Sequence, residues 1–187
     1  PSAIVTVVKD NVQQALIAIG SGAKARIQEQ IASMGSNLLI VLSGTATSGG
    51  VRHGSGSIPT LTVEDAKAIA SELSSVKYAA PVLRGVSQVV FGNQNWSTQV
   101  TGSDNQYFTV TNRSIGAGRS FSESELRAGA AVCIVGEPVR KKLFGGQEAL
   151  GEKIRLQKLS CEIIGILDGK GQNTMGMDQD DIVVIPL

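Results

Sequence analysis

A chain of 187 residues with a formal net charge of +1, from 17 basic and 16 acidic residues, is long enough to bury a hydrophobic core without disulfides or a structural metal. The balanced charge, with no basic stripe and no acidic tail, argues against a nucleic acid or an anionic membrane surface as partner. Aromatic residues make up only 4% of the chain while 22 positions are glycine, which favours short strands and turns over an aromatic-walled pocket for a small molecule.

An amphipathic helix dominates the first part of the chain. Apolar residues recur there at the helical period, at Val12, Leu16, Ile19, Ala23, Ile27, Ile31 and Met34. Because the sequence opens with Pro1 and not with Met, we expect the helix to continue from a segment that precedes it. Gly35 is typical of a helix end, and residues 37–43 are predicted to follow as a strand.

A glycine- and serine-rich segment, residues 44–59, separates this strand from a second helix. The segment has no periodicity and few large apolar side chains, so it is predicted to be a mobile loop. Thr62 and Asp65 are spaced as a capping box and predict a helix that begins there and ends near Leu73. The apolar stripe of this helix indicates that it packs on a sheet.

Two strands and a tight turn are predicted next. Residues 76–91 are rich in valine and are interrupted by Pro81 and Gly85, which predicts one long bent strand or two short ones. Residues 92–95 are typical of a hairpin turn, and the alternation over residues 96–102 predicts the returning strand.

Shorter elements follow Gly102, where we place a subdomain boundary. The predicted elements are a short helix at 105–108, a turn at 116–118, a helix opened by the capping box 122–125, a strand at 130–135, a helix from Glu137 to Phe144, hairpin strands at 153–157 and 160–167, and a strand at 182–187. Since the last strand ends the sequence abruptly, we expect the sheet to continue into a segment after Leu187.

The succession of five sequence blocks resembles the periplasmic core domain of MacB-type ABC transporter permeases. The blocks are residues 27–41 (IQEQIASMGSNLLIV), 61–66 (LTVEDA), 92–98 (GNQNWST), 135–145 (VGEPVRKKLFG) and 151–155 (GEKIR). The resemblance implies an α+β fold in two parts. Residues 1–101 plus 180–187 would form a porter-like part whose second segment is missing, and residues 102–179 an inserted, sabre-like α/β part.

The same resemblance implies a function in export. The chain would be the extracytoplasmic domain of an inner-membrane permease that couples cytoplasmic ATP hydrolysis to export or mechanotransmission, with residues 12–34 as the coupling rod. Its implied partners are a periplasmic adaptor protein, an outer-membrane channel reached through that adaptor, and a second copy in the full-length transporter. The alternative from a different class is a free-standing secreted domain that binds a small ligand or a glycan.

No catalytic, cofactor-binding or metal-binding residues are predicted. His53, the only histidine, lies in the glycine-rich segment without a rigid frame that would hold it near a nucleophile. The segment 20–24 lacks the spacing of a phosphate-binding loop, and Asp178, Asp180 and Asp181 start like a calcium loop but lack its later glycine and glutamate. An enzyme is therefore not expected.

The two cysteines, Cys133 and Cys161, both lie in apolar, strand-like runs. Their spacing does not suit zinc. They are interpreted either as two small buried side chains or as one disulfide formed in an oxidising compartment.

Five residues are candidates for a contact with a protein partner. They are Asn93, Asn95 and Trp96 at the predicted hairpin and Met175 and Met177 in a later loop. The alternatives are that the Trp96 ring packs against the chain's own sheet, and that the methionines belong to an ordinary loop.

Overall fold

The computed structural model describes residues 3–9, 38–42, 47–48, 51–52, 61–172 and 178–187. The strands in this part are β1 Ala3–Lys9, β2 Leu38–Leu42, β3 Thr47–Ser48, β4 Val51–Arg52, β5 Val76–Phe91, β6 Gln94–Ser103, β7 Ile115–Gly118, β8 Val132–Val135, β9 Lys153–Leu156, β10 Leu159–Leu167 and β11 Ile182–Pro186. The helices are α2 Val63–Glu72, α3 Gln106–Val110, α4 Glu123–Ala128 and α5 Glu137–Phe144. The mixture confirms the predicted α+β class.

One large sheet runs through the described residues. Its order is β2-β1-β5-β6-β11-β8-β10-β7, and β9 pairs with both β10 and β5. β11, from the end of the sequence, lies between β6, to which it is parallel, and β8, to which it is antiparallel. The β6–β11 and β11–β8 ladders therefore join residues of both predicted parts, and the boundaries of those parts stay a prediction.

β8 and β11 are buried on both faces. Alternating residues of β8 and β11 divide between two apolar clusters: Val135 and Val183 belong to one, Ile134 and Val184 to the other. Side chains of α5 complete the first cluster, and those of α3 complete the second. Strands covered on both faces show near-continuous apolar runs instead of alternation, which explains the sequence of residues 182–187.

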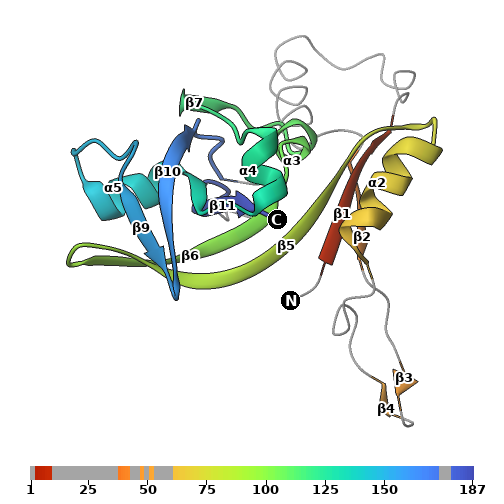
Figure 1. Ribbon diagram of the computed structural model, residues 1–187, viewed down its shortest axis with the longest axis horizontal. Coiled ribbons are helices and arrows are strands. Elements are labelled where there is room, and N and C mark those ends of the chain that lie inside the picture. The colour runs from red at the N-terminus through yellow and green to blue at the C-terminus, as the bar shows by residue number, and fades with distance from the viewer. Residues whose placement is uncertain (1–2, 10–37, 43–46, 49–50, 53–60, 173–177) are drawn as a thin grey trace, which may run out of the picture.

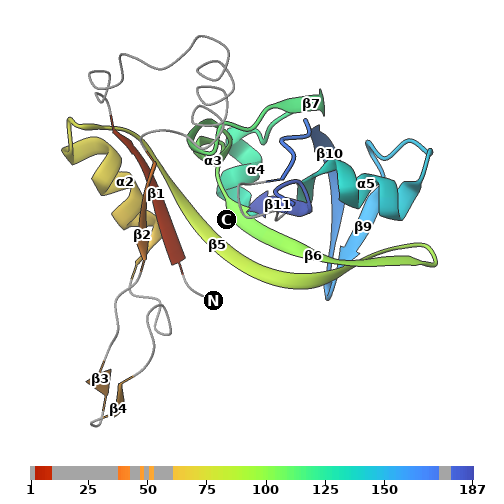
Figure 2. The same cartoon turned by 180° about the vertical axis from the view of Figure 1, so that it is seen from behind.

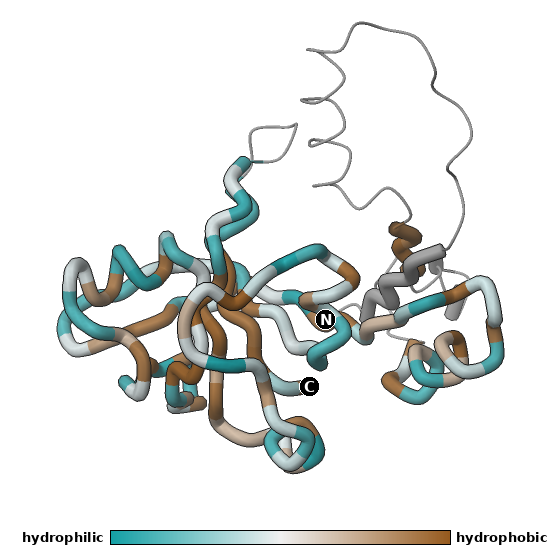
Figure 3. Tube along the Cα trace, turned by 90° about the horizontal axis from the view of Figure 1, so that it is seen from above, coloured by the Kyte–Doolittle hydropathy of each residue, from teal (hydrophilic) through white to brown (hydrophobic). Residues whose placement is uncertain are grey.

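The β1, β2 and α2 region forms one end of the molecule, opposite the β5–β6 turn and α5 (Figures 1 and 2). α2 begins at a capping box in which the Thr62 hydroxyl accepts from the Asp65 N–H and the Asp65 carboxylate accepts from the Thr62 N–H. Its Ala66 packs against Ala79 of β5. Figure 3 shows apolar stretches along the central strands and polar stretches at the turns.

Several predicted elements are confirmed. They include the capping boxes of α2 and α4, the strand–turn–strand of β5 and β6, the hairpin of β9 and β10, and α5 with proline in its first turn. β5 passes through Pro81 and Gly85 as one 16-residue strand, so the single long strand is the correct alternative.

Other predictions need correction. Residues 116–118 are not a turn but part of β7, which pairs with β10. Within the segment predicted to be a mobile loop, residues 47–48 and 51–52 form the small β3–β4 hairpin. β1 was not predicted, although Ile4–Val8 is a run of β-branched residues typical of a strand. The predicted helix of residues 12–34 and His53 lie outside the described residues.

Candidate partner-binding site

The hairpin of β5 and β6, whose turn lies at one end of the molecule, carries two of the predicted contact residues: Asn93 in the turn and Asn95 on β6 (Figure 1). The two strands pair from Leu83 opposite Gly102 to Phe91 opposite Gln94, which leaves Gly92 and Asn93 as a two-residue turn. Gly92 has a φ of +55°, the left-handed conformation that such tight hairpin turns require at this position. Asn95 accepts a hydrogen bond from Gln88 Nε2 across the hairpin at 3.1 Å.

Helix α5 lies beside this turn, and its start is tightly positioned. Gly136 precedes the helix, and its N–H donates to the Ile182 carbonyl at 2.9 Å. A Cβ atom at residue 136 would lie 1.8 Å from the Asp180 carbonyl oxygen, so only glycine fits there. In the first turn of α5, Glu137 accepts two hydrogen bonds of 2.7 Å from Arg140. The sheet therefore determines where α5 begins.

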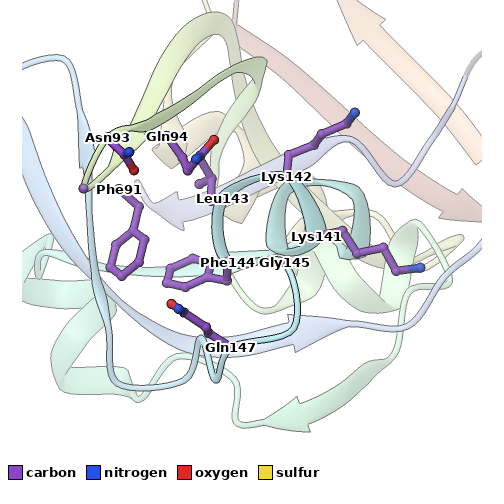
Figure 4. A pocket seen from close by; sticks show the side chains of 10 residues that line it. Phe91, Asn93, Gln94, Lys141, Lys142, Leu143, Phe144, Gly145 and Gln147 are labelled. Carbon is purple, nitrogen blue, oxygen red and sulfur yellow. The ribbon is translucent and has the colours of Figure 1, made fainter.

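A hollow of about 380 Å³, here called the hairpin pocket, lies between this turn and the end of α5. Its lining residues are Phe91, Gly92, Asn93, Gln94, Lys141, Lys142, Leu143, Phe144, Gly145 and Gln147. The Phe91 and Phe144 ring centroids are 4.1 Å apart. Figure 4 shows these rings side by side, the amides of Asn93 and Gln147 on either side of them, and Lys141 and Lys142 extending outward from α5.

Trp96 is tied into the chain's own structure. Its indole N–H donates to the Asp181 carboxylate at 2.9 Å, and the Thr98 hydroxyl donates to the same oxygen at 2.6 Å. The ring packs against the cluster that contains Val183, and Lys142 Nζ lies 4.9 Å from its centroid. These contacts favour the interpretation that Trp96 packs on its own sheet; a contact with a partner stays a prediction.

Asp180 uses its carboxylate to hold a loop. It accepts from the N–H groups of Lys170 at 2.8 Å and Gly171 at 2.7 Å, and forms a buried ion pair with Arg113 at 3.4 Å. Burial lowers the pKa of the Lys170 ammonium, and the nearby Arg113 charge contributes to this shift. Asp180 and Asp181 thus act on different neighbours and do not converge on one cation position. In the described residues no group of three or more histidine, cysteine, aspartate or glutamate side chains is placed to hold a metal.

Both cysteines are free thiols with no exposed surface. Cys133 and Cys161 belong to the same apolar cluster, and the Cys133 thiol is 3.5 Å from the Glu162 carbonyl. Burial, and secondly the neighbouring Cys161 thiol, raises the pKa of the Cys133 thiol. This arrangement agrees with the interpretation of two small buried side chains.

Sequence reasoning missed most of the hairpin pocket. It singled out Asn93, but not Phe91, Phe144 or Gln147. Phe91 ends β5, whereas Phe144 ends α5 and Gln147 follows it, more than 50 residues later in the sequence. A usable signal was the lysine pair Lys141–Lys142, which directly precedes the apolar Leu143 and Phe144 at the end of the helix. Met175 and Met177 lie outside the described residues, so their predicted role is neither supported nor opposed.

The sequence profile of the MacB-like periplasmic core domain matches residues 14–187. The chain belongs to this family. The "Macrolide export ATP-binding/permease protein MacB" of Syntrophobacter fumaroxidans is 39% identical over 173 residues, which is 92% of this chain and 24% of that protein. The "Pyoverdine export ATP-binding/permease protein PvdT" of Pseudomonas syringae pv. tomato is 33% identical over 172 residues, 91% of this chain and 25% of that protein.

Solved structures agree with the MacB-like fold. The periplasmic region of MacB from Actinobacillus actinomycetemcomitans matches with a TM-score of 0.61 and 18% identity, over 98% of this chain and 64% of that one. The extracellular domain of the transporter YknZ from Gram-positive bacteria matches with a TM-score of 0.58 and 19% identity, over 67% of this chain and 62% of that one. Of the two export permeases named above, MacB and PvdT, the chain spans about a quarter of the length. None of the helices in its described part is long and apolar enough to cross a bilayer.

Proposed function

We propose that this MacB-like domain transmits movement in an ABC exporter: ATP hydrolysis elsewhere in the transporter displaces the domain, and the displacement drives export. The domain would stand in the periplasm, work in a dimer of the full-length permease, and contact a periplasmic adaptor that leads to an outer-membrane channel. In this proposal the chain itself is not an enzyme, because the hydrolysis belongs to a nucleotide-binding domain outside it.

The observation that carries the proposal is the 33–39% identity, over more than nine tenths of this chain, to proteins whose names describe ATP-binding permeases for export. The sheet offers a physical means of transmission. Through the β5–β6 and β6–β11 ladders, backbone hydrogen bonds connect the α2 end to the strands that carry α5. Close-packed protein interiors have low compressibility and transmit displacement.

The test uses the full-length transporter in proteoliposomes, with a macrolide such as erythromycin as the exported probe. Gln14, Ser21 and Glu29 occupy the polar side of the predicted 12–34 helix. Glycine at all three positions should weaken the helix by about 3 kcal/mol relative to alanine at the same positions. ATP hydrolysis should persist while export falls severalfold.

The matched control places alanine at the same three positions, which removes the same side chains but favours the helix. Export should then stay near that of the unaltered transporter. Normal export by the glycine variant would contradict transmission through this segment. A free-standing secreted binding domain, the alternative function, would neither need nor show coupling between ATP hydrolysis and transport.

A further inference from the structure

The hairpin pocket differs in charge from two other hollows in the described residues. Of its ten lining residues two are lysine and none is acidic. The hollow of about 450 Å³ beside α5 and β10 contains Glu137, Glu148 and Asp168 but only one basic residue, Arg140. The third hollow, of about 530 Å³, is lined mainly by apolar side chains. Among these three, the hairpin pocket combines a basic margin with an aromatic floor.

The charges of the two lysines in this pocket are only partly neutralised by nearby carboxylates. Lys142 has no carboxylate within 4.0 Å among the described residues, and its Nζ lies 4.9 Å from the centroid of the Trp96 ring. Lys141 lies 3.4 Å from Glu137, but Arg140 already holds that carboxylate through two shorter hydrogen bonds. The margin of the pocket is therefore left with an excess of positive charge.

The remaining lining groups suit a short stretch of polypeptide. The side chains of Asn93, Gln94 and Gln147 are exposed, and each amide can both donate to and accept from a peptide backbone. The Phe91 ring is partly exposed beside the buried Phe144 ring and offers an apolar surface to an inserted side chain. A volume of about 380 Å³ admits a single inserted side chain but not a helix.

We propose that the hairpin pocket binds an acidic loop of the periplasmic adaptor: one apolar side chain of the loop lies on Phe91, and its carboxylates face Lys141 and Lys142. This inference rests on the proposed function, since it names the surface through which the transporter would meet its adaptor. The β5–β6 turn and α5, which line the pocket, form the end of the molecule away from α2 (Figures 1 and 2).

The first experiment measures binding of the purified adaptor to the full-length transporter in nanodiscs by biolayer interferometry. The variant K141E/K142E should weaken binding about tenfold or more, because it turns two attractive charges into repulsive ones. The variant Gln147→Glu should weaken it in the same direction without touching a lysine. Raising the salt concentration should weaken wild-type binding and leave the K141E/K142E variant less affected.

The control is K67E/K77E, which makes the same change in net charge at exposed positions near α2. It should bind the adaptor as the wild type does. An equal loss in both double variants would overturn the proposal, because net charge and not this pocket would then govern binding. A change in transporter dimerisation with unchanged adaptor binding would also overturn it and would indicate a second copy as the occupant.

The second experiment identifies the loop. A photo-crosslinking amino acid at Asn93 should join the transporter to an acidic segment of the adaptor, and reversing the charge of that segment should restore binding to K141E/K142E. Crosslinks to an uncharged surface would contradict the proposal. If the wild-type transporter does not bind the adaptor at all, the proposed function fails; if it binds and K141E/K142E binds equally well, only the present inference fails.

Discussion

β11 and β2 are both short apolar strands, but β11 is buried and β2 is largely exposed. Val183 and Val184 of β11 have no exposed surface, because paired strands lie on both sides and apolar clusters on both faces. Among the described residues β2 is an edge strand, on which Leu39, Ile40 and Leu42 are 59%, 52% and 54% exposed. Similar local sequences thus give a closed core in one place and an open apolar edge in the other. The unpaired backbone groups of such an edge can form hydrogen bonds with another strand.

The largest expected effect on stability is at Gly136, which lies against the backbone just before β11. Gly136→Ala would place a methyl group against the Asp180 carbonyl, and the backbone around the start of β11 would have to move. We expect the free energy of unfolding to fall by about 3 kcal/mol, measured by urea denaturation. Gly146→Ala is the control: nothing lies within 4 Å of its added Cβ, so its stability should change little. Equal effects would show that the steric argument is wrong.

The second prediction compares the two strands directly. Val183→Ala should lower the free energy of unfolding by about 2 kcal/mol, because it leaves a cavity in a closed core. Leu42→Ala removes a larger apolar group but should cost about 0.5 kcal/mol or less in this chain, because the side chain is already mostly in water. Chemical denaturation of both variants under the same conditions measures the difference. A larger loss for Leu42→Ala would mean that β2 is covered in solution.

The third prediction concerns the polar tie between β6 and β11. Trp96→Phe removes the indole N–H that donates to Asp181 but keeps an aromatic ring in the core. It should cost about 1 to 2 kcal/mol, because Asp181 then keeps only the hydrogen bond from Thr98. A double-mutant cycle with Asp181→Ala, which removes the accepting oxygens, measures the coupling. Additive effects of the two changes would show that this tie contributes nothing.

The smallest expected effect lies at α4, away from both strands. The hydrogen bonds from Arg119 lower the pKa of Glu125 to about 2 from its ordinary value of 4.5, and the Ser122 N–H adds to the shift. Since the folded state has the lower pKa, the stabilisation is present above pH 4.5 and is lost as the pH falls toward 2. Because the Arg119 side chain is 55% exposed, we expect Glu125→Gln to cost under about 1 kcal/mol at neutral pH.

Melting temperatures recorded between pH 7 and pH 2 measure this effect. The wild type and Glu125→Gln should differ above pH 4.5 and converge toward pH 2. Glu64→Gln, at an exposed position of α2, should show no such convergence. A constant gap at every pH would contradict an electrostatic origin.

Local signals predicted well wherever a few neighbouring residues supply the stabilising contact. The capping pairs Thr62–Asp65 and Ser122–Glu125 marked the starts of α2 and α4, and the turn at Gly92 marked the hairpin. The glycines of residues 116–118 misled, because pairing with β10, which is distant in sequence, makes that segment a strand. The hairpin pocket was missed for the same reason, since Phe91 and Phe144 meet only after α5 packs beside the β5–β6 turn.

The sequence by itself determined the α+β class, the order of most elements from β5 to β11, and the family. The order of the elements follows from period, caps and turns, which depend on residues close together in the chain, whereas the class and the family rest on the resemblance of the five sequence blocks. Only the tertiary structure decided that β11 lies between β6 and β8, that Asp180 and Asp181 bind different neighbours, and that α5 and a hairpin turn enclose a basic pocket. Those features depend on which distant segments pair and exclude water, and no local pattern specifies that choice.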